Sequence, residues 1–175
     1  LDPGAKPGAA HREGSVLSER AAVLLRQADT FFIATATPPA RRQGAADGVD
    51  ISHRGGRPGF IRVAEEDGAT VLTLPDFRGN NAFNTLGNIA LEPRAGLLVV
   101  DFASGDLLSL TGEGMVIWDG EELRSFAGAQ RLLKLRVTGG LLRPAAIPLR
   151  WSQPQPAPQL GATGSWVRAP GGTSG

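Results

Sequence analysis

The chain has 175 residues, which suits a single domain, and its 18 Lys and Arg residues against 17 Asp and Glu residues give a formal net charge of +1. Nucleic-acid-binding domains carry a large basic excess, so we expect no nucleic-acid partner. The absence of cysteine excludes disulfides, thiolate metal sites and thiol nucleophiles, and with only two histidines we expect no metal site. No apolar run approaches the ~20 residues of a membrane span, and no signal peptide is visible, so we expect no membrane partner and a cytoplasmic location.

The first part of the chain predicts an arm, a helix and a strand. Residues 1–14 carry charges and prolines, and we expect them to form a mobile N-terminal arm. Ser15 is expected to cap a helix over residues 16–27, where apolar residues recur at helical spacing. The apolar residues 31–36 then predict a short strand, which is followed by a loop over residues 37–48.

Residues 49–54 alternate in character, which predicts a strand with Val49, Ile51 and His53 on one face and Asp50, Ser52 and Arg54 on the other. The segment 107–118 contains Gly112 and Gly114, which predict a bulge or a close backbone approach. Further strands are predicted over residues 60–63, 70–74, 95–102, 107–118 and 132–137, a loop over residues 75–79, and helices over residues 80–91 and 119–128, with Asp119 as the N-cap of the last.

These elements predict a mainly β fold with short helices, in which six or seven antiparallel strands form a small barrel. Gln, Pro, Gly and Ala dominate residues 152–175, which are expected to form an extended, largely disordered tail. Trp166 could dock onto the folded part, but a solvated tail is the favoured interpretation. The expected organisation is therefore an arm over residues 1–14, a barrel domain over residues 15–151 and a tail over residues 152–175.

The densest cluster of reactive side chains lies in residues 52–60, with the sequence SHRGGRPGF. Ser52, His53 and Arg54 lie beside glycines that let a ligand approach the backbone. A charged strand end followed by a turn explains the same residues, and composition slightly favours that second interpretation. The cluster is therefore a candidate binding site, with the strand end and turn as the slightly favoured alternative.

A second cluster spans residues 75–85, with the sequence PDFRGNNAFNT. Asn80 or Asn81 would lie at a helix N-terminus, where free N–H groups and the helix dipole favour an anion, and Arg78 adds a forked pair of donors. Asparagine also caps helices without any ligand, and this motif by itself favours capping. No carboxylate pair and no nucleotide-binding glycine loop is present, so no catalytic residue is assigned.

Four segments together resemble the pyridoxamine 5′-phosphate oxidase-like flavoproteins, the FMN-binding split barrels. The closest likeness is to the branch with SHRGG-x-PG and PDF-x-GNN motifs, and it covers roughly residues 21–151. The segments are VDISHRGGRPGFIRV at 49–63, LPDFRGNNAFNTLGNIAL at 74–91, PRAGLLVVDF at 93–102 and GDLLSLTGEGMVIW at 105–118. The resemblance implies a six-stranded antiparallel split β-barrel that forms a homodimer and binds FMN at the subunit interface.

The resemblance also assigns residues to the FMN site. The strand that contacts the flavin would supply Ser52, His53 and Arg54, and the strand of the partner subunit would bring Ser109 and Thr111 near the ring. The phosphate would be held by Arg78, Asn80, Asn81 and Asn84, and the ring or ribityl chain would be bordered by Leu74, Pro75, Asp76 and Phe77. If Arg78 holds the phosphate, its truncation is expected to weaken FMN binding by ~1.5–3 kcal/mol.

Two departures from the family pattern narrow the function. Asn80 and Asn81 stand where true pyridoxamine-phosphate oxidases have an Arg-Lys pair, and no histidine follows His53. We therefore expect an FMN-dependent oxidoreductase that is not a true pyridoxamine-phosphate oxidase, with NAD(P)H or a reductase as its electron donor and an acceptor that the sequence leaves open. Trp151 would stack near the flavin or, as the favoured interpretation, anchor the chain by hydrophobic contact.

The alternatives are a non-enzymatic flavin- or haem-binding module, with His53 as the haem ligand, and a structural barrel with an empty groove. A deazaflavin, F420, in place of FMN is a further variant.

Overall fold

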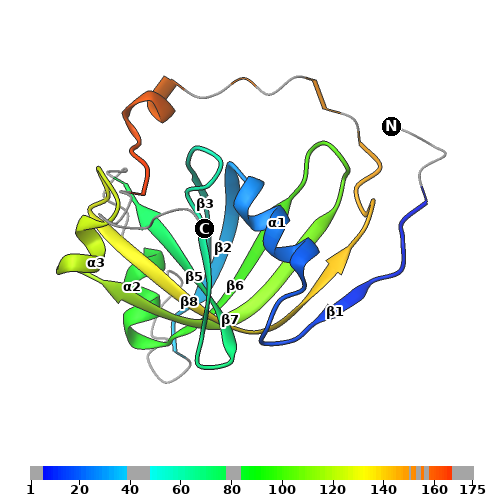
Figure 1. The fold of residues 1–175 in the computed structure, drawn as a ribbon. Coiled ribbons are helices and arrows are strands. Elements are labelled where there is room, and N and C mark those ends of the chain that lie inside the picture. The colour runs from blue at the N-terminus through cyan, green and yellow to red at the C-terminus, as the bar shows by residue number, and fades with distance from the viewer. Residues whose placement is uncertain are drawn as a thin grey trace, which may run out of the picture.

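The computed structural model describes residues 6–38, 48–77, 84–149, 151–152, 155 and 158–166. In this part of the chain one antiparallel sheet curls around a hydrophobic core, with short helices at its margins (Figure 1). The strands are β1 (His11–Glu13), β2 (Thr30–Ala36), β3 (Val49–Gly55), β4 (Arg62–Glu66), β5 (Ala69–Asp76), β6 (Arg94–Val100), β7 (Leu107–Ile117) and β8 (Arg131–Arg143). The helices are α1 (Glu19–Gln27), α2 (Asn84–Leu91), α3 (Glu121–Arg124) and a 3₁₀ helix, η2 (Pro158–Ala162).

The strands follow one another in the order β3-β2-β6-β7-β8-β5-β4, and β1 pairs with β8 outside this path. All of these pairings are antiparallel. β3 and β4 are the two ends of the path, so the curled sheet is open between them. This architecture confirms the predicted split β-barrel, mainly antiparallel β with a few short helices. The predicted number of six or seven strands was too low, because the described residues form a sheet of eight strands that includes the short β1.

Alternation along the strands separates a core face from an outer face. In β2, Phe31 and Ile33 are fully buried, whereas Phe32 between them is 36% exposed. The same alternation runs along β6 and β7, so inward-facing aliphatic side chains of neighbouring strands meet inside the barrel. The helix α1 closes one end of this core through Ala21 and Leu25, which are also fully buried.

The expected bulge in β7 is confirmed. The pairing of β7 with β8 shifts register between Thr111 and Gly112. A Cβ atom at Gly112 would lie 2.4 Å from the carbonyl oxygen of Arg136, so the backbones of the two strands approach one another too closely for any side chain.

The start of α1 differs from the prediction, because Ser18 and not Ser15 is the N-cap. The Ser18 hydroxyl accepts a hydrogen bond from the Ala21 N–H at 3.3 Å, and the buried Glu13 carboxylate accepts from both the N–H and the hydroxyl of Ser18 at 2.8 Å. The Leu17 N–H donates a hydrogen bond to the Thr70 hydroxyl, and Leu17 lies before the start of the helix. Contacts distant in sequence therefore fix where this helix begins.

Two further boundaries were predicted wrongly. The N-cap of α3 is Gly120, without a side-chain cap, and not Asp119. β5 continues through Pro75 and Asp76, which were predicted to begin a loop. Both residues pair with the first residues of β8, a partner that local sequence does not reveal.

The two terminal segments make contacts that their composition did not indicate. Within the expected N-terminal arm, β1 pairs with the far end of β8. Within the expected tail, η2 forms and Trp166 is partly buried in a bridge to Phe126. Trp151 packs edge-on against Phe102 with ring centroids 5.1 Å apart, so it acts as a hydrophobic anchor on the β6–β7 hairpin. The placement of the domain boundaries stays a prediction.

None of the helices in the described part of the chain combines the length and the apolar character that a membrane span requires.

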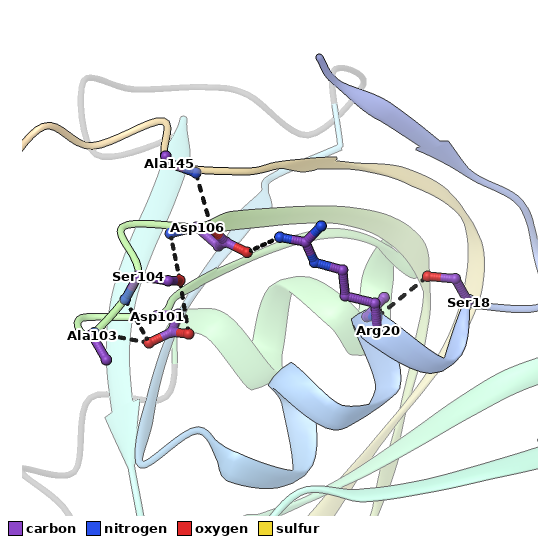
Figure 2. A network of polar contacts seen from close by, with 8 residues as sticks. Ser18, Arg20, Asp101, Ala103, Ser104, Asp106 and Ala145 are labelled. Atoms are coloured by element: carbon purple, nitrogen blue, oxygen red, sulfur yellow. Dashed lines mark hydrogen bonds and ion pairs between the residues drawn. The ribbon is translucent and has the colours of Figure 1, made fainter. Parts of the chain in front are cut away.

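A polar network ties α1 to the β6–β7 turn (Figure 2). The carboxylate of Asp106 is 9% exposed and accepts hydrogen bonds from Arg20 at 2.6 Å and from the Ala145 N–H at 2.9 Å. Burial acts to raise the pKa of Asp106, but the hydrogen bonds with Ala145, Arg20 and Ser104 outweigh it and hold the pKa below its usual 3.8. The folded state therefore favours the ionised form of this carboxyl.

The substitution Asp106→Asn is expected to lower the free energy of unfolding by about 1 kcal/mol at neutral pH. A pKa that is lower in the folded state gives stabilisation above the unfolded pKa, which is lost as pH falls through the folded value. Urea unfolding at pH 7 and at steps below about pH 4 should therefore show the difference from wild type shrinking with acidity. A difference that stays constant over this range would assign the loss to packing rather than to charge.

Candidate functional site

The edge strand β3 has the two faces that its sequence predicts. Val49 and Ile51 are 69% and 68% exposed and lie on the outer face with His53. The other face, which carries Asp50, Ser52 and Arg54, is directed toward the interior of the barrel, because these residues pair with the inward-facing Thr35, Ile33 and Phe31 of β2.

An ion cluster bridges the opening between β3 and the other end of the sheet. The Arg54 guanidinium donates to the carboxylate of Asp76 at the end of β5. Arg131, the first residue of β8, places Nη1 3.7 Å from the second carboxylate oxygen of Asp76. The side chains of Arg54, Asp76 and Arg131 are only 19%, 11% and 15% exposed. Two guanidiniums around one carboxylate leave the cluster with a net positive charge.

One N–H group of Arg54 finds no hydrogen-bond acceptor within the ion cluster. Among the described residues, its Nε is a buried side-chain nitrogen without a hydrogen-bond partner. A buried polar group without a partner costs about 1–3 kcal/mol, so the cluster gains stability when an acceptor reaches this N–H. A small anion, such as a phosphate group, has the charge and the acceptor atoms that this position requires.

A chain of hydroxyl groups joins β3 to the first turn of α2. Thr85 Oγ1 donates to the Asp50 carboxylate at 2.6 Å, and its single proton is thereby used. The 2.9 Å contact between Ser52 Oγ and Thr85 Oγ1 must then have Ser52 as the donor. Ser52 therefore has only lone pairs left, and it can accept, but not donate, a further hydrogen bond.

The substitution Thr85→Val, which keeps the shape of the side chain, is expected to lower the free energy of unfolding by about 1–2 kcal/mol. The side chain is 2% exposed, so the loss leaves the Asp50 carboxylate and the Ser52 hydroxyl without a buried partner. Thr85→Ser keeps the hydroxyl and should retain most of the stability in chemical denaturation. Equal losses for the two variants would show that the methyl group matters and the hydroxyl chain does not.

The predicted phosphate-binding segment is described only in part. Asn84 is the first residue of α2 and is exposed. Arg78, Asn80 and Asn81 lie outside the described residues. On the preceding strand, Leu74 is 1% exposed within the hydrophobic core and Pro75 is buried. Phe77, directly after this strand, packs edge-on against Phe126 with centroids 5.6 Å apart.

Ser109 and Thr111 lie on the outer face of the sheet, opposite to the inward-facing Arg54. The register places them in line with Leu98 and Gly96 of β6, which pair with Phe32 and Ala34 on the outer face of β2. Thr111 Oγ1 donates to the Gly139 carbonyl at 3.2 Å. A shallow hollow of about 430 Å³ lies on this face and is lined by Ala34, Thr35, Ala36, Val49, Arg94, Ala95, Gly96, Thr111, Gly112, Glu113 and Thr138.

His53 is also on the outer face, at the edge of the sheet. Its Nε2 contacts Thr30 Oγ1 in a short hydrogen bond, and its ring tilts against Phe32 with centroids 5.6 Å apart. The structure therefore divides the predicted residues into two groups. Ser52, Arg54 and Asp76 lie inside the opening of the barrel, whereas His53, Ser109 and Thr111 lie on the apolar outer face.

Three polar residues of the site were not assigned to it from the sequence, namely Asp50, Thr85 and Arg131. The alternation of β3 already placed Asp50 on the same face as Ser52 and Arg54. Asp50 could therefore have been assigned to the site from the sequence. Thr85 and Arg131 reach the site only through the packing of α2 and the pairing of β5 with β8.

The sequence matches no family model and no curated protein. The fold is similar to two structures of HupZ from group A Streptococcus, with TM-scores of 0.52 and 0.50 at 10% identity, covering 71% and 70% of this chain and 98% and 90% of theirs. It is also similar to a putative pyridoxamine 5′-phosphate oxidase from Lactobacillus delbrueckii, with a TM-score of 0.50 at 14% identity over 72% of this chain and 93% of that one. These likenesses confirm the split-barrel fold of the pyridoxamine 5′-phosphate oxidase-like proteins.

Proposed function

We propose that the chain binds FMN as a homodimer and acts as an FMN-dependent oxidoreductase. The observation that carries this proposal is the buried Nε of Arg54, which has no partner among the described residues, in a positively charged cluster at the opening of a split barrel. The sequence resemblance to FMN-binding split barrels, together with the shared fold, supports the phosphate of FMN as the proposed anion.

The phosphate is held by charge-assisted hydrogen bonds. Arg54 offers the free N–H, and Arg131 adds a second guanidinium beside Asp76. Arg78, Asn80, Asn81 and Asn84 complete this site according to the resemblance. Since Ser52 can only accept, it would hold an N–H group of the ligand.

The outer face supports a dimer with the flavin between the subunits. Phe32, Val49 and Ile51 form an exposed apolar surface on β2 and β3. Contiguous apolar surface of this kind is a mark of protein–protein contact. In the proposed dimer this surface is covered, and Ser109 and Thr111 of each subunit lie near the flavin of its partner.

Bound FMN supplies the transfer of electrons, and the protein positions the ring and limits its contact with water. NAD(P)H or a reductase is proposed as the electron donor, and a small molecule as the acceptor. Residues of the chain act on the cofactor through binding and orientation, with Ser52 accepting a hydrogen bond from the ring system.

The visible absorption spectrum of the purified protein, with mass analysis of the released chromophore, tests the cofactor. A flavin spectrum and the mass of FMN support the proposal. A Soret band that disappears in His53→Ala would instead identify a haem protein, and a deazaflavin mass would identify F420. A colourless protein whose melting temperature does not rise with added FMN would be a structural barrel.

A further inference from the structure

Trp166 docks the C-terminal segment onto the barrel through four kinds of contact. Its ring packs edge-on against Phe126 with centroids 4.8 Å apart, and the guanidinium of Arg62, the first residue of β4, lies 3.7 Å from the centroid of the indole ring. The indole Nε1–H donates to the Phe60 carbonyl at 3.1 Å. The Ala127 N–H donates to the Ser165 carbonyl at 3.1 Å, so the backbone is also paired.

The docked backbone leaves no space for a side chain at Gly164. A Cβ atom there would lie 1.9 Å from the Ala127 carbonyl oxygen. The contact is with backbone and cannot be relieved by a change of rotamer. The segment therefore fits this position only with glycine at residue 164.

From Trp166, two series of contacts lead to the ion cluster. One passes through Phe126 to Phe77, which directly follows Asp76. The other begins with the hydrogen bond from the indole to the Phe60 carbonyl, and the ring of Phe60 lies against Gly56, two residues after Arg54. A Cβ atom at Gly56 would lie 2.4 Å from the Phe60 ring, so this contact is close. Trp166 thus contacts Phe126 and Phe60. These two residues connect it to Asp76 and to Arg54, respectively.

We propose that Trp166 is a positioning residue for the candidate FMN site, and that docking of residues 163–166 and binding of FMN favour each other. The inference rests on the proposed function. Docking fixes Phe60 and Phe126, and these in turn fix the chain around Arg54 and Asp76. Because coupling between two binding events is reciprocal, FMN must stabilise the docked segment by the same factor by which docking strengthens FMN binding.

Hydrogen exchange and FMN titration of the full chain test this proposal. Trp166→Ala and Gly164→Ala are both expected to raise amide exchange in residues 56–62 and 76–77 without ligand, and to weaken FMN binding about fivefold or more. Gly164→Ala leaves the indole in place and displaces the backbone, so agreement between the variants identifies docking itself. Trp166→Phe should restore part of the effect, since it keeps the ring contact with Phe126. Trp151→Ala, which removes a tryptophan that packs on Phe102, should change neither measurement.

Unchanged exchange in both segments, or unchanged FMN affinity despite raised exchange, would overturn the proposal. If the wild-type chain binds no FMN, the proposed function fails. The exchange measurement then still decides whether docking of Trp166 orders the chain around Arg54 and Asp76.

Discussion

Replacing Arg54 with glutamine is expected to weaken FMN binding by about 10- to 100-fold, the effect of losing one charge-assisted hydrogen bond. The wild-type Nε is buried without a partner among the described residues, so an arriving phosphate gains this donor without first breaking another hydrogen bond. Glutamine keeps part of the length and polarity of arginine but removes its charge and its forked geometry.

Riboflavin provides the matched ligand control, because it has the same ring and lacks the phosphate. The wild-type chain should bind FMN more tightly than riboflavin, and Arg54→Gln should reduce this preference while changing riboflavin affinity little. Arg12→Gln alters an exposed arginine on β1, which pairs with the far end of β8, and should leave both affinities unchanged. Equal losses for the two ligands in Arg54→Gln would place Arg54 away from the phosphate.

Introducing alanine at Gly112 is expected to lower the free energy of unfolding by about 3 kcal/mol. The new Cβ atom would lie 2.4 Å from the Arg136 carbonyl and 3.0 Å from the Leu135 side chain. Relief of this overlap requires β7 and β8 to separate, and these two strands form the centre of the sheet. The register of the bulge, and with it the position of Thr111, depends on this contact.

Gly87→Ala is the matched control for this prediction. Gly87 lies in α2 with no atom within 4 Å of the added Cβ atom, so alanine should raise stability by roughly 0.5–1 kcal/mol through helix propensity. Chemical denaturation of both variants gives the comparison. A small loss for Gly112→Ala, similar in size to the change at Gly87, would contradict the close approach of β7 and β8.

Local sequence patterns were sufficient to predict much of the fold. The two faces of β3 and the strands β6 and β7 follow from patterns of residues that lie within a few positions of one another. The bulge at Gly112 was likewise predicted from a glycine inside an apolar strand. These features depend on backbone preferences and on burial of one face, which short segments display.

Other features depend on contacts between distant parts of the chain. Ser15 and Ser18 are both capable caps, and the buried carboxylate of Glu13 is what selects Ser18. Arg131 reaches Asp76 through pairing of strands that are far apart in the sequence. The tail around Trp166 has the composition of a disordered segment, yet the Phe126 ring, the Arg62 guanidinium and the Phe60 carbonyl hold it. None of these partners is visible in a local window.

The same distinction applies to the candidate site. The segment 52–54 was identified from its residues and the family resemblance, and the structure places Ser52 and Arg54 on the inner side of the opening. The chain of hydroxyls through Thr85 depends on the docking of α2, and this could not be derived from either segment by itself. The assignment of these residues to FMN stays a prediction.

Native mass spectrometry of the full chain, equilibrated with FMN, measures cofactor and assembly together. We expect a species of two chains with two FMN molecules, and loss of bound FMN in Arg54→Gln at the same concentration. A single chain that carries no flavin at FMN concentrations well above the micromolar range would contradict it.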